Sequence, residues 1–458
     1  MATRHSKAAE QFQTNREKAQ WQDNTLWGVR VKRDRMAQSL DEWEDLRNMA
    51  SEIKKHTATH LDIYLEKFAE KAQDNGAVVH WAKDAEEFNE TVLSILKSRG
   101  VMKLVKSKSM LTEECEMNPY LENNGIKVVE TDLGERIIQL LDQKPSHIVM
   151  PAIHLTQEEV GALFEKELGS EKGNSDPTYL TYCARKSLRN EFMTADAGLT
   201  GANFAVAEPG EIVVCTNEGN ADMSTSVPKL HIAAVGIEKV IPDYKSLAVF
   251  HRLLARSATG QPSTTFTSHF RSPRPECEFH IILVDNGRSS MLSDDSHWEA
   301  LKCIRCGACM NTCPVYRRSG GYSYTYFIPG PIGINLGMLR DGRKFHDNVS
   351  ACSLCCSCDN VCPVKVNLSE QIYKWRQQLK DFGKEPTSKK MMSKGMGIIF
   401  DRPWLYSAAL GCSPIINAAV TGAENAGLKL WGKGRDLPEF SKEPFHVMWK
   451  KGKVKNDK

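Results

Sequence analysis

Residues 303–314 read CIRCGACMNTCP, and residues 352–363 repeat the same spacing as CSLCCSCDNVCP. Both stretches fit the pattern C-x2-C-x2-C-x3-C-P without a gap, which is the pattern that binds [4Fe–4S] clusters in two-cluster ferredoxins. The two-residue spacers wrap the chain around one cubic cluster, so three thiolates reach three of its irons. The fourth cysteine lies too far along to bind the same cluster. The spacing therefore predicts two [4Fe–4S] clusters.

The fourth cysteine of each motif is predicted to bind the cluster of the other motif, as it does in this class of ferredoxin. Each cluster then takes three cysteines from one motif and one from the other. The ligands predicted for cluster 1 are Cys303, Cys306, Cys309 and Cys362, and those predicted for cluster 2 are Cys352, Cys355, Cys358 and Cys313. Structural zinc is the main alternative, but zinc sites usually use two separated cysteine pairs rather than three consecutive ligands and a fourth before proline.

The remaining cysteines carry no comparable spacing. Nine of the fourteen lie within the 60 residues from Cys303 to Cys362, and the other five are scattered through mixed sequence, where reduced thiols are expected. Cys356 lies inside the second motif but off its pattern, so we interpret it as a packing thiol, with exchangeable ligation as the alternative.

The 38 residues between the motifs exceed the spacer of a compact bacterial ferredoxin and predict a larger, helical type of ferredoxin domain.

The apolar periodicity divides the chain into four parts. Steps of three and four residues predict a helical N-terminal lead-in over residues 1–75. Between residues 76 and 290, short β-branched runs alternate with helical stretches, which predicts an α/β domain on a mostly parallel sheet. A helical ferredoxin-type domain follows at 291–385, and a short basic region at 386–458. The expected strands are 78–81, 101–105, 126–130, 147–150, 212–216, 230–235 and 279–284.

Composition and charge exclude several classes of protein. The 60 basic and 57 acidic side chains nearly cancel, and we find neither a helix-turn-helix pattern nor a basic stripe, so no nucleic-acid partner is expected. The N-terminus holds no apolar run typical of a signal peptide, and the most apolar late stretch is too short and too polar to span a membrane. We therefore expect a cytoplasmic protein, where thiols stay reduced.

The C-terminal part is more basic than the rest of the chain. From Gln371 onward, 17 basic residues stand against 8 acidic ones. A solvated tail explains this excess, and an acidic protein partner or an anionic surface is the alternative.

Polar residues at predicted strand ends form a candidate pocket in the α/β domain. Lys106 and Lys108 follow the strand at 101–105, where they can pair with a carboxylate or a phosphate. Glu208, Asn217 and Glu218 lie in loops rich in glycine and asparagine, where they can line the strand-end crevice in which α/β sheets bind ligands. The alternative is that these are ordinary surface lysines and loop-building residues.

The sequence contains no motif for a second redox cofactor. We find no C-x-x-C-H for haem, no G-x-x-x-x-G-K-[ST], and no convincing G-x-G-x-x-G after a strand. Two clusters without such a motif predict an electron conduit, which needs a partner at each end.

Segments along nearly the whole chain resemble the lactate utilisation protein B family of iron–sulfur proteins. Both cysteine motifs carry this resemblance, together with several short segments. These are KSKSM at 106–110, ETDLGE at 130–135, PSHIV at 145–149, GANFAVAE at 201–208, TNEGN at 216–220, HI at 231–232 with GIEK at 236–239, and GRDLP at 434–438.

The resemblance implies a LUD domain, with the NagB/RpiA/CoA-transferase-like α/β fold, followed by an α-helical domain with two [4Fe–4S] clusters. It also implies an electron-transfer subunit of a three-component cytoplasmic system that oxidises L-lactate to pyruvate. The other components would be a cysteine-rich subunit and a small LUD-domain subunit, and this chain would be a non-catalytic or co-catalytic subunit. The alternatives are an electron-transfer subunit for another 2-hydroxy acid, such as glycolate, and a redox- or ligand-sensing iron–sulfur protein.

Overall fold

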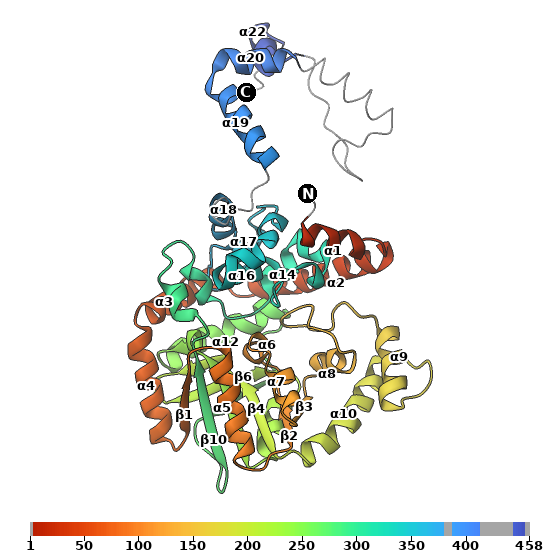
Figure 1. Cartoon of the computed structure of the whole chain (residues 1–458), viewed down its shortest axis with the longest axis vertical. Coiled ribbons are helices and arrows are strands. Elements are labelled where there is room, and N and C mark those ends of the chain that lie inside the picture. Colours follow the sequence, from red (N-terminus) through yellow and green to blue (C-terminus); the bar gives the residue numbers. More distant parts are fainter. Residues whose placement is uncertain (1–2, 380–386, 413–442, 454–458) are drawn as a thin grey trace. The chain divides into compact units, whose positions relative to one another are not determined.

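A computed structural model describes residues 3–379, 387–412 and 443–453 of the chain (Figure 1). The chain divides into two compact units, of which Ala2–Phe382 form the larger and Gly383–Lys458 the smaller. The smaller unit contains α19 (Thr387–Asp401), α20 (Pro403–Gly411) and α22 (Phe445–Lys450). The GRDLP segment at 434–438 and part of the predicted basic region lie outside the described residues.

A six-stranded parallel sheet forms the centre of the larger unit. Its strands, in spatial order, are β1 (Val78–Ala82), β10 (Glu278–Val284), β7 (Leu230–Gly236), β4 (Ala197–Gly201), β2 (Lys103–Lys106) and β3 (Lys127–Glu130). Every neighbouring pair is parallel, so all carboxyl ends meet at one edge. The central strands β4 and β7 are buried along their whole length, as expected where helices cover both faces. The predicted α/β fold class is confirmed.

Three helices begin at an aspartate that lies two residues after the end of a strand. The carboxylates of Asp84, Asp132 and Asp243 accept backbone N–H groups in the first turns of α5 (Ala85–Lys97), α8 (Leu133–Leu140) and α12 (Tyr244–Ala258) at 2.8–3.1 Å. An aspartate in this position satisfies a helix donor that would otherwise lack a partner. The other helices of this domain are α6 (Met110–Glu114), α7 (Met117–Asn123), α9 (Gln157–Leu168), α10 (Pro177–Met193), α11 (Asn220–Ser226) and α13 (Arg288–Leu292).

A second, four-stranded sheet lies beside the cysteine-rich domain. Its strands, in spatial order, are β8 (Val240–Ile241), β5 (Phe204–Val206), β6 (Glu211–Thr216) and β9 (Phe266–Phe270). Phe204 stacks on Phe250 of α12 with ring centroids 5.1 Å apart. The same hydrophobic core continues into the cysteine motifs through Ile304 and Val364. The α/β and ferredoxin domains are therefore joined by one continuous core.

The N-terminal helices pack against the rest of the larger unit. They are α1 (Arg4–Phe12), α2 (Arg16–Gln38), α3 (Trp43–Thr59) and α4 (Leu61–Asp74). Leu26 of α2 and Ala50 of α3 are fully buried in the core that also holds the cysteine motifs. Helix α4 packs in a separate core. The helical lead-in therefore packs as part of the larger unit.

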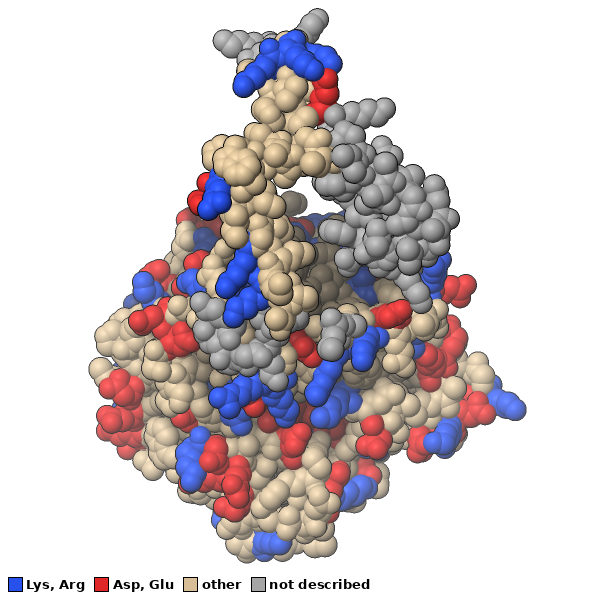
Figure 2. Space-filling model, turned by 45° about the horizontal axis from the view of Figure 1, so that its top comes forward, with Lys and Arg blue, Asp and Glu red and all other residues tan. Residues whose placement is uncertain are grey.

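The ferredoxin part consists of short helices around the two motifs. They are α14 (Ala308–Thr312), α15 (Pro314–Ser319), α16 (Gly330–Phe345), α17 (Ser357–Val361) and α18 (Leu368–Gln378). Figure 1 shows α14, α16 and α17 above the parallel sheet. On the face shown in Figure 2, the described Lys and Arg side chains are interspersed with Asp and Glu, in line with the nearly balanced charge. None of the helices in the described ranges could cross a bilayer.

One expected strand is wrong. Residues 147–150 form a bend rather than a strand, and Ile148 is buried in the core that contains the cysteine motifs. The apolar run reflects burial against another domain, which a single sequence does not distinguish from burial in a sheet. Four strands were not expected, because β5 and β8 are very short, β4 is rich in small residues, and β9 is mostly polar between two phenylalanines. The remaining expected strands match observed ones to within about two residues.

Candidate cluster sites and the cavity beside them

The two cysteine motifs share one backbone conformation. The third and fifth positions of each motif have positive φ angles, at Arg305 (60°) and Gly307 (78°) in the first and at Leu354 (55°) and Cys356 (58°) in the second. These left-handed residues turn the chain twice within five positions. The Arg305 N–H consequently points at the sulfur of Cys303, at 3.4 Å, and the equivalent amide in the second motif does the same at 3.3 Å. Amides in this arrangement stabilise thiolate charge.

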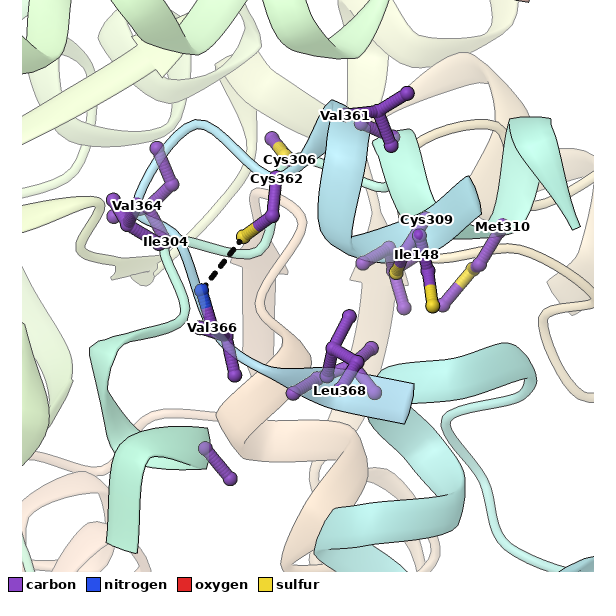
Figure 3. Close-up of a cluster of buried hydrophobic side chains, with 14 of the residues drawn as sticks. Ile148, Ile304, Cys306, Cys309, Met310, Val361, Cys362, Val364, Val366 and Leu368 are labelled. Atoms are coloured by element: carbon purple, nitrogen blue, oxygen red, sulfur yellow. Dashed lines mark hydrogen bonds between the residues drawn. The ribbon is translucent and has the colours of Figure 1, made fainter. Parts of the chain in front are cut away.

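All four ligands predicted for cluster 1 line one small cavity. Three of them come from the first motif, and Cys362 comes from the second. Figure 3 shows Cys306, Cys309 and Cys362 among the buried apolar side chains. The Val366 N–H donates to the sulfur of Cys362 at 3.3 Å. Burial raises the pKa of the Cys309 thiol well above its usual value, and the neighbouring thiols of Cys303 and Cys306 raise it further. Such a site favours metal-bound thiolates, whose charge the iron neutralises.

The cysteines predicted for cluster 2 also lie together. Burial raises the pKa of Cys313 to about 11, and the nearby Cys352 and Cys355 contribute to the increase. Burial also raises the pKa of Cys358, which has the same three cysteines among its charged neighbours. Cys355 is exposed, whereas Cys306 of the other set is only 8% exposed. The second set therefore lies nearer the surface.

The arrangement of these thiols is consistent with a cubic cluster. Within the described residues, no group of three or more His, Cys, Asp or Glu side chains is placed to hold one metal ion. In a [4Fe–4S] cluster each cysteine binds a different iron, so its ligands surround a cavity rather than converge on one point. The four thiols around one cavity and the amides directed at sulfur are consistent with this requirement.

Cys356 occupies the position that Gly307 holds in the first motif. Its sulfur contacts the Ser369 hydroxyl and the Leu354 carbonyl at 3.5 Å, and no metal-ligand geometry involves it among the described residues. We expect Cys356→Gly to keep its full iron content and to raise the free energy of unfolding by up to about 1 kcal/mol, because glycine adopts positive φ without strain. Iron analysis and urea unfolding test this, and loss of iron would identify Cys356 as a ligand.

Helices α2 and α3 hold the second motif through its backbone. Arg33 donates to the Val361 carbonyl at 3.0 Å. Arg47 donates to the carbonyls of Cys362 and Asp359 at 3.0 and 3.2 Å. Both arginines are buried, and sequence reasoning missed them because more than 300 residues separate each from its partner.

A larger cavity of about 350 Å³ lies where the α/β domain meets the first cysteine motif. Three of the predicted residues line it, namely Lys108, which follows β2 of the parallel sheet, and Asn217 and Glu218, which follow β6 of the second sheet. From the ferredoxin side, Arg305 and Cys306 complete the lining. The cavity therefore borders one predicted ligand of cluster 1.

The other two candidate residues lie elsewhere. Lys106 is buried and pairs with Glu113 at 2.8 Å and with Glu130 at 2.6 Å. These carboxylates raise its pKa in spite of its burial. Glu208 is exposed in the turn between β5 and β6. Neither side chain lines the large cavity.

A buried ionic network forms one side of the cavity. Arg288 pairs with Glu238 and, at 2.8 Å, with Glu114, and Arg305 lies 3.7 Å from Glu238. Burial acts to raise the pKa of Glu238, but Arg288, Lys239 and Arg305 lower it to about 2. Glu238 and Lys239 follow β7, and Arg288 follows β10. Because ligands bind at the carboxyl ends of parallel strands, a search of the residues after these two strands would have found all three.

A second group of carboxyls lies near Lys108. The Lys108 ammonium donates to the Val149 carbonyl at 2.8 Å and lies 3.8 Å from Glu135. Glu218 faces the cavity but is otherwise surrounded by protein. The resulting loss of hydration and the negative charge of Asp132 raise the pKa of Glu218 to about 7. Burial raises the pKa of Glu135 to about 8, although Lys108 opposes the shift.

The raised pKa of Glu135 predicts a pH-dependent stability. The folded chain keeps the Glu135 proton up to about pH 8, whereas the unfolded chain loses it near the ordinary glutamate pKa of 4.5. Stability should therefore fall as the pH rises through this window. We expect Glu135→Gln to reduce that fall by on the order of 3 kcal/mol in urea unfolding between pH 5 and pH 8. The exposed Glu208→Gln is the control, and equal pH profiles for both variants would contradict the prediction.

Comparison with known proteins gives the family. The model of the LUD domain matches residues 65–289, and that of the 4Fe-4S dicluster domain matches residues 299–366. Lactate utilization protein B of Shouchella clausii (strain KSM-K16) is 43% identical over 425 residues, which cover 90% of this chain and 89% of the relative.

Two further relatives cover nearly the same length. Lactate utilization protein B of Geobacillus kaustophilus (strain HTA426) is 42% identical and covers 91% of this chain and 90% of its own. The "uncharacterized electron transport protein YkgF" of Escherichia coli (strain K12) is 39% identical and covers 95% of this chain and 94% of its own. The chain therefore belongs to the lactate utilization protein B family of iron–sulfur proteins, with a LUD domain followed by a 4Fe-4S dicluster domain.

Proposed function

We propose that this chain is the electron-transfer subunit of a cytoplasmic three-component system that oxidises L-lactate to pyruvate. In this proposal the eight motif cysteines hold two [4Fe–4S] clusters, with one ligand of each cluster taken from the other motif. The observation that carries the proposal is the cavity lined by three cysteines of the first motif and by Cys362 of the second. The names of the relatives support the link to lactate.

The chain's own residues supply the binding sites and their rigidity. Bound [4Fe–4S] clusters provide one-electron redox chemistry. The cysteines hold them, and the amides of Arg305 and Val366 stabilise the sulfur charge. Arg33 and Arg47 keep the second motif in place against the first. No side chain is assigned as an acid or a base.

The two ligand sets differ in what they face, which suggests a direction for electrons. Cys306 borders the large cavity at the strand ends, whereas Cys355 is exposed at the surface. We infer that electrons enter on the cavity side and leave near Cys355. The partners would be a cysteine-rich subunit and a small LUD-domain subunit. We also retain the domain boundaries 1–75, 76–290, 291–385 and 386–458 as part of the proposal.

The deciding experiment combines metal analysis with spectroscopy of the purified chain under anaerobic conditions. We expect about eight irons and about eight sulfides per chain, because two cubic clusters contain that number. Electron paramagnetic resonance (EPR) should show both clusters after dithionite reduction, and reduction by L-lactate only when both partner subunits are present.

Each other outcome removes a defined part of the proposal. Full cluster content without reduction by lactate keeps the conduit and discards this substrate, and glycolate and other 2-hydroxy acids are then tested with the assembled system. Turnover of lactate by the purified chain alone would contradict the role of relay. Zinc in place of iron would overturn the proposal altogether.

A further inference from the structure

The large cavity lies at the topological switch point of the parallel sheet. From β2 the chain moves outward to β3, and from β4 it proceeds in the opposite direction to β7 and β10. The crevice outside the carboxyl ends of β2 and β4 is where open parallel sheets bind ligands. Ser109 follows β2, Gly201 ends β4, and both line the cavity. The sheet topology therefore marks this cavity as a ligand site, independently of the cysteine motifs.

Two cationic side chains at the cavity have unused hydrogen-bond donors. The Arg305 side chain is 11% exposed, and its Nη1 is buried without a hydrogen-bond partner. Lys239 is half-buried and makes no hydrogen bond or ion pair with any other described residue. Burial lowers its pKa to about 8, so the side chain stays mostly protonated at neutral pH. Arg288 differs, since Glu114 and Glu238 already satisfy it. Cationic side chains with free hydrogen-bond donors beside a cavity favour a bound anion.

The size of the cavity limits the kind of anion. Its volume of about 350 Å³ falls within the range of about 300–1,000 Å³ in which proteins bind drug-sized ligands. A three-carbon acid would leave much of this space empty. Apolar side chains such as Leu254 and Ile328 form part of the lining, so the site also offers contacts to a non-polar moiety.

We infer that this cavity binds an organic anion larger than a three-carbon acid, whose carboxylate or phosphate is held by Lys239 and Arg305. Binding itself does not depend on the proposed electron relay. Only one consequence rests on that function, namely that the bound molecule lies beside Cys306 and hence beside cluster 1. Lys239 comes from the α/β domain and Arg305 from the cysteine motif, so the site exists only when the two domains are docked.

Equilibrium dialysis of the full, cluster-loaded chain under anaerobic conditions tests the inference with defined probes. Flavin mononucleotide is the phosphate-bearing probe and citrate the carboxylate-bearing probe. Riboflavin, which lacks the phosphate, and L-lactate, which is small, are the comparison probes. We expect at least one large anion to bind more tightly than both comparison probes. The inference would be overturned if neither flavin mononucleotide nor citrate bound more tightly than both riboflavin and L-lactate.

Matched lysine variants locate the site. We expect Lys239→Met to weaken binding of the anionic probe about 10- to 100-fold, because a charge-assisted hydrogen bond is lost, and Lys239→Arg to restore most of it. Lys229→Met is the control, since Lys229 directly precedes the same strand at its opposite end and its side chain is 78% exposed. Unchanged binding in Lys239→Met would overturn the assignment.

The same samples separate this inference from the proposed function. Full iron content with no anion binding would remove only the inference. Anion binding by a chain that lacks iron–sulfur clusters would remove only the relay.

Discussion

Replacing Cys362 with serine is expected to remove cluster 1 while cluster 2 remains. The iron content should fall from about eight to about four per chain, and the EPR signal of one reduced cluster should disappear. The reason is that Cys362 lies in the second motif by sequence but lines the cavity of the first motif's cysteines. The reciprocal variant Cys313→Ser should damage cluster 2 more than cluster 1.

The control for both variants is Cys356→Ser, which changes a cysteine of the second motif that lies outside the spacing pattern. It should retain both clusters. If Cys362→Ser instead removed the cluster held by Cys352, Cys355 and Cys358, each motif would bind its own cluster, and the crossed ligand assignment would be wrong.

Replacing Arg288 with alanine is expected to destabilise the larger unit by about 3–5 kcal/mol. Arg288 is buried and pairs with both Glu238 and Glu114, so its removal leaves two carboxylates without their main cationic partner in a poorly hydrated site. Urea unfolding followed by circular dichroism measures the loss. Arg288→Lys should lose less stability than Arg288→Ala, because lysine keeps the positive charge. It should still be less stable than the wild type, because an ammonium cannot bridge two carboxylates as a planar guanidinium does.

The control is Arg99→Ala, which removes a more exposed ion pair with Glu278. Exposed pairs contribute about 0.2–1 kcal/mol, so this variant should be nearly as stable as the wild type. An equal and small effect of both substitutions would show that the network around Arg288 contributes little to stability.

Much of the fold follows from local patterns in the sequence. The cysteine spacing constrains a short loop, and its two copies predicted the iron–sulfur character that the 4Fe-4S dicluster match supports. Strands such as β7 and β10 are continuous apolar runs, so their burial in a parallel sheet was predictable. Residues 147–150 show where such reasoning fails, because the same apolar signal here marks contact with the ferredoxin domain.

The candidate cavity was only partly predictable. Lys108, Asn217 and Glu218 line the cavity, as expected from their positions after strands. Lys106 lies two residues before Lys108 but does not line the cavity, because it pairs with Glu113 and Glu130 instead. Lys106 is the last residue of β2, whereas Lys108 lies beyond the strand end, so strand alternation does not relate the two side chains. Which of them reaches the cavity depends on what packs there.

The sequence by itself determined the cysteine loops, most strands of the parallel sheet and the fold class, because each depends on residues within a few positions of one another. Only the tertiary structure decided that a cavity joins the strand ends to the first cysteine motif, which cations there keep free donors, and that α2 and α3 support the second motif. Those features join residues as far apart as Arg33 and Val361 or Lys239 and Arg305. Such contacts arise from strand order and domain docking, which no local spacing encodes.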